Sequence, residues 1–248
     1  MGIDVNRFAR LQLLYGTDGL DLLAGKSVAV FGLGGVGSYA VEGLVRGGIG
    51  RLTLVDFDKV DITNLNRQLQ ALEGTVGRPK SLLMAERCRA INPAVEIEPI
   101  EAFYSAENSE ELLGRGYDYV LDCIDQVTAK LHLIEHCVAA KLPIISSMGA
   151  ANKLDPTQVR VADLAQTRKC RLARIVRKEL RKRGVESGVR VVYSTEQFRP
   201  LAEGRRDVAS DEHYQQRRAP LGSSSVIPPI FGLTMAGEVL RDLLGGDT

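Results

Sequence analysis

Tryptophan is absent from the 248 residues, and histidine and cysteine are scarce, with three and four copies. The cysteines, Cys88, Cys123, Cys137 and Cys170, lie far apart and form no C-x-x-C pair. This spacing indicates a reducing compartment and argues against a structural zinc site. The chain shows neither a signal peptide nor an apolar run of transmembrane length. We therefore expect a cytoplasmic protein with no membrane partner.

The net charge is only +1, which by itself suggests no polyanionic partner. The charges are nevertheless unevenly distributed. Residues 168–183 contain nine Lys or Arg and one Glu, a net of +8, so the rest of the chain carries −7. This basic segment predicts a nucleic-acid surface. The alternative is a solvated helix face, for which a buried stripe would be supplied by Leu172, Ile175, Val176 and Leu180.

A glycine-rich turn between two apolar strands is the most informative stretch. Val28–Phe31 is typical of a buried strand, and Gly32, Gly34 and Gly37 follow where the chain must turn tightly into a helix. The next strand, 52–55, ends on Asp56, nineteen residues after Gly37, where a ribose hydroxyl would need an acceptor. Absent side chains let backbone N–H groups approach a phosphate. The pattern predicts a nucleotide site but leaves NAD, FAD and ATP open.

Strands and helices alternate through the first 150 residues. We expect strands at 95–100, 119–121 and 144–147, helices from Lys80 and over 129–140, and a further helix at 6–15. The alternation predicts an α/β fold, with a doubly wound, Rossmann-like, mostly parallel sheet whose carboxyl edge binds the ligand. A C-terminal extension should add strands at 158–163 and 189–194, a long mobile crossover loop at 199–225 and a closing helix at 230–244.

The segment after Asp56 distinguishes among the nucleotides. It reads TNLNRQ over residues 63–68, and a dehydrogenase needs no such polar, cationic group there. An enzyme that uses ATP must neutralise triphosphate charge. Arg67 offers a planar fork of donors, Asn66 an amide and Lys80 a point charge at a helix start. Asp125, just after the strand that ends at Asp122, is suited to Mg²⁺, although it could simply cap the following helix.

Five motifs together (GLGGVGS, D-x-D, NLNRQ, G-R-P-K and D-C-I-D) spread over about half the chain. Their combination resembles the ubiquitin-activating-enzyme-like superfamily, the adenylating enzymes related to ThiF, MoeB and HesA. The resemblance implies one adenylating domain over 1–248, with a helical segment (1–24), a nucleotide-binding unit (25–150) and a substrate-facing extension (151–248). It implies ATP and Mg²⁺ as cofactors, Asp125 as the metal ligand, and catalytic roles for Arg67, Lys80 and Asp125. The implied ATP-binding set is Gly32, Gly34, Gly35, Gly37, Asp56, Thr63, Asn64, Asn66, Arg67, Lys80, Asp125 and Arg10.

Within this superfamily the chain is more similar to the tRNA threonylcarbamoyladenosine dehydratases, chiefly through VGRPK, MAERCRAINP and LDPTQVRVADLAQT (154–167). That similarity implies ATP-dependent cyclisation of N6-threonylcarbamoyladenosine, beside the anticodon of a tRNA, through an acyl-adenylate. Two residues depart from the pattern. Arg10 matches an arginine that adenylyltransferases insert into the partner subunit's site, so we expect a homodimer. Gln126 replaces a commoner Asn beside Asp125.

Several alternatives remain open at this point. The substrate could be the C-terminus of a ubiquitin-like sulfur carrier, and a sulfur-relay protein could be a partner. An NAD-dependent oxidoreductase is disfavoured by the NLNRQ motif, and a non-catalytic binding module is disfavoured by the intact ATP motifs. Cys170 could carry a reactive thiol, although a lone cysteine is usually incidental. His132 and His136 have the spacing of metal ligands, but no third ligand is evident.

Overall fold

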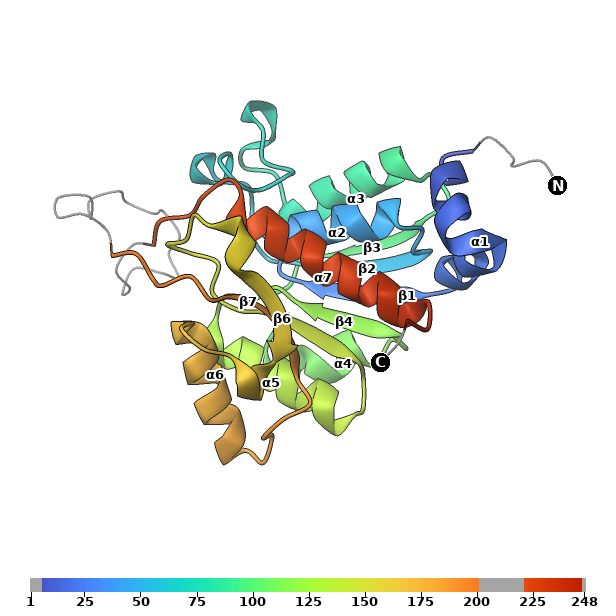
Figure 1. The fold of residues 1–248 in the computed structure, drawn as a ribbon. Helices are drawn as coiled ribbons and strands as arrows, with labels where there is room; N and C mark the ends of the chain where they lie inside the picture. The colour runs from blue at the N-terminus through green and yellow to red at the C-terminus, as the bar shows by residue number, and fades with distance from the viewer. Residues whose placement is uncertain (1–5, 201–220, 247–248) are drawn as a thin grey trace.

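The computed structural model describes residues 6–200 and 221–246 and arranges them around one seven-stranded sheet (Figure 1). The spatial order of its strands is β3-β2-β1-β4-β5-β7-β6, and all neighbours are parallel except β6 and β7. The predicted doubly wound, mostly parallel sheet is therefore confirmed. The strands are β1 (Ser27–Phe31), β2 (Arg51–Val55), β3 (Glu96–Ile100), β4 (Tyr119–Asp122), β5 (Ile144–Ser147), β6 (Val159–Asp163) and β7 (Arg190–Ser194).

Helices cover both faces of the sheet (Figure 1). The first face carries α2 (Gly37–Arg46), α3 (Lys80–Ile91) and α7 (Ile227–Leu243), and the second carries α4 (Ser109–Leu113), α5 (Val127–Ala139) and α6 (Arg171–Lys182). Helix α1 (Ala9–Ala24) precedes β1 and lies beside the carboxyl end of α7 (Figure 1). Short 3₁₀ turns occur at η1 (Ile62–Asn64), η2 (Glu73–Thr75), η3 (Ala106–Asn108), η4 (Pro156–Gln158) and η5 (Leu164–Gln166).

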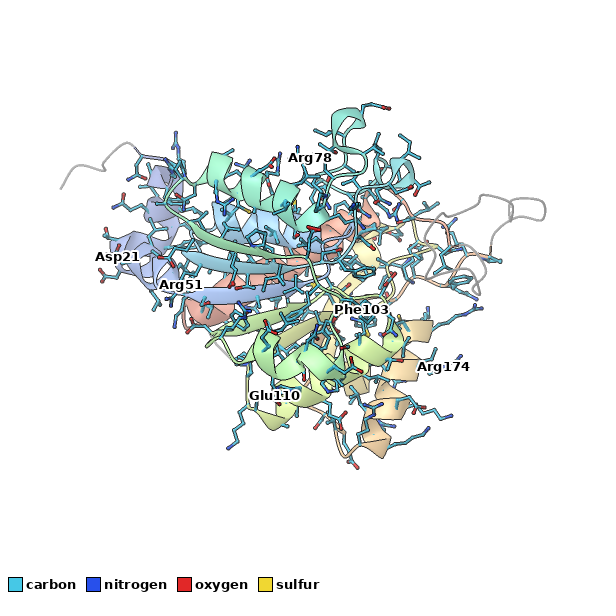
Figure 2. All side chains as sticks on the ribbon, turned by 180° about the vertical axis from the view of Figure 1, so that it is seen from behind. Asp21, Arg51, Arg78, Phe103, Glu110 and Arg174 are labelled. Atoms are coloured by element: carbon cyan, nitrogen blue, oxygen red, sulfur yellow. The ribbon has the colours of Figure 1, made fainter. Side chains whose placement is uncertain are left out.

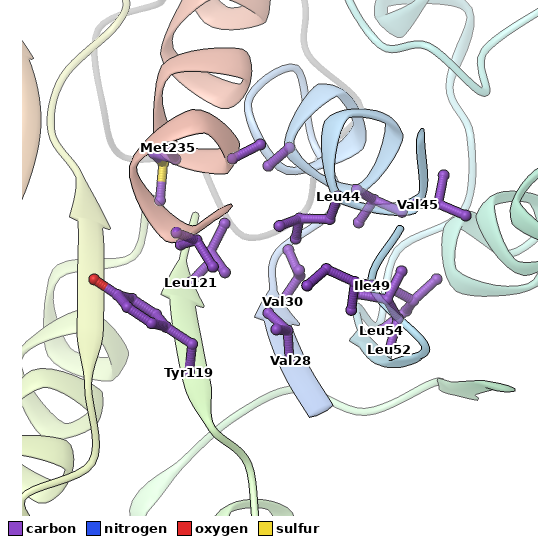
Figure 3. Close-up of a cluster of buried hydrophobic side chains, with 14 of the residues drawn as sticks. Val28, Val30, Leu44, Val45, Ile49, Leu52, Leu54, Tyr119, Leu121 and Met235 are labelled. Carbon is purple, nitrogen blue, oxygen red and sulfur yellow. The ribbon is translucent and has the colours of Figure 1, made fainter. Parts of the chain in front are cut away.

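Side-chain alternation along β1 divides the core into two layers. Val28 and Val30 join the cluster under α2, α3 and α7, which Figure 3 shows together with Leu44, Ile49, Leu121 and Met235 from neighbouring elements. Ala29 and Phe31 point to the opposite face, under α4, α5 and α6. Because both faces of β1 are covered, the strand reads as a continuous apolar run in the sequence.

Close packing of α7 on α2 brings the start of α7 to the glycine-rich turn. A Cβ on Gly232 would lie 2.1 Å from the Val36 carbonyl oxygen, so only glycine permits this approach. Helix α7 begins at Ile227, three residues earlier than the sequence predicted, with Pro228 and Pro229 in its first turn. Proline is tolerated there because the first helical N–H groups have no partner within the helix.

Other boundaries also differ from expectation. Helix α1 extends to Ala24, well beyond the predicted 6–15, and is kinked at Gly16, whose φ is 73°. The short helix α4 was not predicted. The middle of the predicted crossover loop, residues 201–220, lies outside the described residues. Within the described ranges, no helix combines the length and apolarity needed to cross a bilayer.

Candidate functional site

The glycine-rich turn leaves the carboxyl end of β1 and opens α2. Of its glycines, Gly32 has a positive φ, 89°, whereas Gly34, Gly35 and Gly37 do not. Gly37 is required for space instead, since a Cβ there would lie 1.8 Å from the Gly32 carbonyl oxygen. The tight turn thus requires glycine for two reasons, positive φ at Gly32 and the lack of room for a Cβ at Gly37. Among residues 6–200 and 221–246, apart from the two neighbours of Gly34 in the chain, only the Gln68 side chain lies within 4.0 Å of a would-be Cβ on Gly34, so its backbone is accessible to a ligand.

Asp56 lies beside this turn at the end of β2, as predicted. One carboxylate oxygen accepts the Leu33 N–H at 2.5 Å and the other accepts the Asp58 N–H at 2.8 Å. Burial raises the pKa of the Asp56 carboxyl above 3.8, although the Lys80 ammonium and both N–H bonds act in the opposite direction. Each oxygen keeps acceptor capacity beyond its one backbone bond, so the side chain can still accept from a ribose hydroxyl.

Lys80 begins α3 and is brought to the same edge by its contacts with Asp58. Its ammonium lies 2.8 Å from an Asp58 carboxylate oxygen, and its backbone N–H donates to the Asp58 carbonyl oxygen at 3.0 Å. The side chain is almost completely buried. Lys80 is therefore at the start of a helix, as predicted, and a neighbouring carboxylate, which was not predicted, holds its ammonium in place.

The TNLNRQ segment forms η1 and the turn after it. Arg67 donates through one terminal nitrogen to the Thr63 carbonyl oxygen and to the Asn66 side-chain oxygen, both at 2.9 Å. Its Cγ would be 3.2 Å from a Cβ on Gly35, which places the arginine against the glycine-rich turn. Asn66 also donates to the Ser223 carbonyl oxygen at 2.9 Å, joining this segment to the chain before α7.

Asn64 differs from the other predicted members of this segment because it is fully buried. Its side-chain oxygen accepts the Asp61 N–H at 3.2 Å, and the Asp61 carboxylate in turn caps the Thr63 N–H at 2.7 Å. This reciprocal cap is the reason that the polar sequence forms a 3₁₀ turn. Asn64 thus shapes the turn, while Thr63 and Asn66 are exposed.

Asp125 lies on the connection from β4 to α5, at the same edge of the sheet. The connection packs against the glycine-rich turn, because Cys123 N–H donates to the Phe31 carbonyl oxygen at 2.8 Å and the Cys123 carbonyl would contact a Cβ on Gly32 at 2.9 Å. Asp125 is exposed. No group of three or more His, Cys, Asp or Glu able to hold a metal occurs in the described part of the chain. One carboxylate together with nucleotide phosphates and water nevertheless matches the way Mg²⁺ is usually bound.

Arg10 is the predicted residue that the fold does not bring to this edge. It lies on the first turn of α1, and the same helix packs against the carboxyl end of α7, where Leu244 would contact a Cβ on Gly19 at 3.2 Å. This is the amino edge of the parallel strands. Arg10 is therefore not part of the site of its own chain. Its predicted role in ATP binding requires that it insert into the site of a second copy.

Cys170, His132 and His136, the other residues considered for chemistry, make contacts that are typical of structural side chains. Cys170 is buried and caps α6, with its sulfur 3.5 Å from the Ala173 nitrogen, which argues against a reactive thiol. His132 Nδ1 lies 3.0 Å from the Tyr104 hydroxyl, and His136 Nδ1 lies 3.9 Å from a Glu110 oxygen. These contacts support ordinary helix histidines.

The basic segment forms α6, which begins at the carboxyl edge of the sheet. A Cβ on Gly149, just after β5, would be 3.6 Å from both the Cys170 sulfur and the Leu172 Cβ. Ile175 is 45% exposed and does not belong to the buried stripe, whereas Ala173 does. Most basic side chains of the segment are exposed, as Figure 2 shows for Arg174: Arg168, Lys169, Arg171, Arg174, Lys178, Arg181, Lys182 and Arg183.

Arg177 is the exception on α6. Its terminal nitrogen donates to the Leu164 carbonyl at 3.2 Å, the Thr167 carbonyl at 2.8 Å and the Thr167 hydroxyl at 2.6 Å. Arg177 is therefore a structural residue that holds the connection between β6 and α6, and it is not one of the exposed cations available to a nucleic acid.

Two features of the edge were not singled out from the sequence. Phe57 and Phe103, the latter labelled in Figure 2, form an edge-to-face pair with ring centroids 5.1 Å apart beside Asp56. Both rings are exposed. Phe57 follows Asp56 directly, which was an available signal, whereas Phe103 comes from the segment after β3. The second feature is Lys130, a fully buried ammonium that bonds to Asp122 at 2.6 Å.

Comparisons with known proteins show the family and the fold of this chain. Residues 5–248 match the model of the ThiF family. A tRNA threonylcarbamoyladenosine dehydratase of Bacillus subtilis (strain 168) is 45% identical over 242 residues, covering 97% of this chain and 95% of the relative. The crystal structure of the E. coli tRNA N6-threonylcarbamoyladenosine dehydratase, TcdA, in complex with ATP has a TM-score of 0.87 at 35% identity, covering 99% of this chain and 98% of that one.

The similarity to an adenylyltransferase is shorter. The molybdopterin-synthase adenylyltransferase of Escherichia coli (strain K12) is 38% identical over 151 residues, which is 60% of this chain and 59% of that protein. The likeness to the dehydratase thus extends over nearly the whole chain, whereas the likeness to the adenylyltransferase covers little more than half of it.

Proposed function

Because this chain belongs to the ThiF family, we propose that it is an ATP-dependent tRNA threonylcarbamoyladenosine dehydratase. The observation that carries the proposal is the 45% identity to such an enzyme over 97% of the chain. The carboxyl edge of the sheet supports it, because Gly34, Asp56, Arg67 and Lys80, which we predicted to bind ATP, all lie there. The substrate is N6-threonylcarbamoyladenosine in tRNA, and the product is its cyclic, dehydrated form.

Different residues at the carboxyl edge of the sheet bind different parts of ATP. The open backbone at Gly34 and the start of α2 take the phosphates, and Asp56 accepts from the ribose. The exposed Phe57–Phe103 pair offers the adenine an apolar surface. Arg67, supported by Gly35, and Lys80, supported by Asp58, supply positive charge toward the triphosphate.

The reaction then needs little acid–base chemistry from the protein. The threonyl carboxylate is already ionised and attacks the α-phosphorus, so that a C–O–P bond forms and pyrophosphate leaves. An atom of the same modification attacks the acyl carbon and closes a ring, while the acyl C–O bond to AMP breaks, AMP leaves and the proton of the attacking atom passes to water. Because both reacting groups belong to one substrate, the second step is effectively unimolecular. Arg67 and Lys80 stabilise the charge that develops in the first step.

Mg²⁺ fits the remaining donor, the exposed Asp125 carboxylate. Asp125 would hold the ion, and Mg²⁺ held there would supply additional positive charge to offset that of the leaving pyrophosphate. The protein contributes the β4–α5 connection that carries this carboxylate, and the Cys123 backbone of that connection packs against the glycine-rich turn.

The tRNA contacts α6 in this proposal. The helix starts beside Gly149 at the edge that binds ATP, and its exposed Lys and Arg side chains extend away from the sheet. Phosphate contacts along α6 orient the tRNA, and the unstacked modified base enters the ATP edge.

A homodimer completes the site. Leu13 and Leu14 on α1 are 62% and 74% exposed, an apolar surface that a second copy would cover. Because Arg10 lies on the same helix and far from its own chain's nucleotide edge, a two-fold dimer would place it in the partner's site.

One experiment separates the substrates. Purified protein is incubated with ATP and Mg²⁺ and with threonylcarbamoylated tRNA, the unmodified tRNA or a ubiquitin-like sulfur carrier, and the release of pyrophosphate and AMP is measured. We expect both products only with the modified tRNA, together with the loss of one water from the nucleoside by mass spectrometry. Pyrophosphate release with the sulfur carrier alone would contradict the proposal. Calorimetry should find ATP binding and no NAD binding.

A further inference from the structure

Lys130 occupies an unusual place for a lysine, because its side chain is completely buried at the carboxyl ends of two strands. It lies one turn into α5, and its ammonium reaches back to β4 and β5. The acceptors are an Asp122 carboxylate oxygen at 2.6 Å, the Ser146 hydroxyl at 3.1 Å and the Ser147 carbonyl at 2.9 Å. These three bonds use all the protons of the ammonium group.

Asp122, the partner of Lys130, is also completely buried and controls the chain that follows it. The carboxylate oxygen that receives Lys130 also accepts the Ser146 hydroxyl at 2.5 Å. The other oxygen accepts the N–H of Ile124 at 3.1 Å. The ion pair is thereby connected directly to the backbone one residue before Asp125.

The four residues between β4 and α5 are thus held at both ends. At one end, Asp122 lies in register with Phe31 of β1, and Cys123 N–H donates to the Phe31 carbonyl oxygen at 2.8 Å. At the other, the Gln126 side chain accepts from the Ala129 N–H and caps α5. Lys130 links the helix to the strand across this connection, so it fixes how far α5 stands from β4 and where the short connection must run.

Stability alone is a poor explanation for such a pair. Desolvating two charges offsets most of their attraction, and well-packed apolar replacements are often as stable or more stable. A buried ion pair does, however, impose directions and distances that apolar side chains do not. Metal sites depend on neighbours that orient the ligand, and their loss typically weakens metal affinity about 10- to 100-fold.

We propose that Lys130, through Asp122 and Ser146, is a positioning residue that sets the Asp125 carboxylate for the metal–nucleotide complex. This inference rests on the proposed role of Asp125. In this proposal Lys130, which is completely buried, contacts neither the nucleotide nor the metal. It acts by holding the β4–α5 connection that carries Asp125.

The test measures Mn²⁺ binding by electron paramagnetic resonance in the presence of a non-hydrolysable ATP analogue, alongside thermal unfolding. Lys130→Met should weaken Mn²⁺ binding about tenfold or more and should destabilise the protein, because Asp122 is left as an uncompensated charge. Adding Asp122→Leu removes that charge. The double variant should regain stability without regaining Mn²⁺ affinity, whereas recovery of both would show that the pair is purely structural and overturn the inference.

Two further variants keep the test decisive. Ser146→Ala removes one bond to Asp122 while leaving the ion pair in place, so it gives a milder loss of Mn²⁺ affinity in a folded protein. Lys26→Met is the matched control, because the Lys26–Asp118 pair, 3.0 Å apart, lies at the amino end of the same β4. It should leave Mn²⁺ affinity unchanged; an equal loss in this control would overturn the inference.

Asp125→Asn separates this inference from the proposed function. If Asp125→Asn leaves Mn²⁺ binding unchanged, the metal role of Asp125 in the proposed function fails, and the inference fails with it. If Asp125→Asn weakens binding while Lys130→Met and Ser146→Ala do not, only the positioning role of Lys130 is refuted.

Discussion

The exposed basic residues of α6 should carry the salt dependence of tRNA binding. Replacing Arg174, Lys178 and Arg181 by glutamine removes three solvent-exposed cations, each able to contact one phosphate. Each lost contact reduces the slope of log affinity against log salt by about 0.7 to 0.9, so the triple variant should lose about 2 to 3 units of slope. Arg177 is left unchanged because it bonds to Leu164 and Thr167.

The slope translates into an affinity ratio that can be measured. Raising salt from about 50 to about 200 mM should cost the wild type about 20- to 40-fold more affinity than the triple variant. Filter binding or fluorescence anisotropy with the modified tRNA gives both curves, and calorimetry should show nearly unchanged ATP affinity, because none of the three residues lies at the nucleotide edge.

A control variant of equal charge tests the location of this effect. Arg51, Arg89 and Arg241 are exposed at the amino edge of the sheet, and their replacement by glutamine should leave the slope near that of the wild type. Equal slopes for wild type and the α6 variant, or equal losses in both triple variants, would refute the assignment of the tRNA to α6. Arg177→Gln should instead lower the unfolding temperature.

Four other outcomes follow from the nucleotide edge. Gly37→Ala should destabilise the protein by about 3 kcal/mol or more in denaturant unfolding, because its Cβ would meet the Gly32 oxygen at 1.8 Å. Wild-type stability in this variant would contradict the geometry. Gly34→Ala should change stability by about 0.5 kcal/mol or less and mainly weaken ATP binding. Burial raises the pKa of Asp56 above 3.8, so on acidification Asp56 should become protonated, and ATP affinity should fall, at a higher pH than for an ordinary carboxyl. Asp56→Asn should bind ATP weakly and without this pH dependence. Calorimetry that finds the same pH profile in the wild type and in Asp56→Asn would count against the role of Asp56. Arg67→Ala should lose about 100-fold or more in turnover with nearly unchanged stability, and a variant that unfolds but keeps its turnover per folded molecule would refute the role. Mixing inactive Arg10→Ala and Arg67→Ala proteins should restore part of the activity if Arg10 acts in the partner's site, whereas no recovery, or a monomer in ultracentrifugation, would exclude that arrangement.

The sequence alone predicted the sheet, and with it the edge at which we propose that the nucleotide binds. The apolar strand before Gly32, the nineteen-residue spacing to Asp56 and the NLNRQ segment are local patterns, and local backbone geometry is what such patterns specify. Strand ends of a parallel sheet meet at one edge whatever the distance between them in the chain. The convergence of the glycine-rich turn, Asp56 and Asp125 could therefore be predicted before any contact was known.

The partner of each charge could not be predicted in this way. Arg177 and Arg174 look equivalent in a basic helix, yet only Arg177 reaches the carbonyls of the preceding turn. Lys80 was predicted as a positive charge at a helix start, but its partner Asp58, twenty-two residues earlier, was not. Charged side chains pair through tertiary contacts, and the order of residues along the chain does not directly give the distances between their charged groups in the fold.

The tertiary structure alone also decided which residues belong to one site. Arg10 matches a nucleotide-binding motif but lies at the opposite edge of the sheet, because α1 packs on the carboxyl end of α7. Lys130 matches none of the motifs, yet it is buried against Asp122 behind the predicted metal ligand. Both outcomes depend on how helices pack on the sheet, and packing is settled by the whole set of buried contacts, whereas a motif records only its own residues.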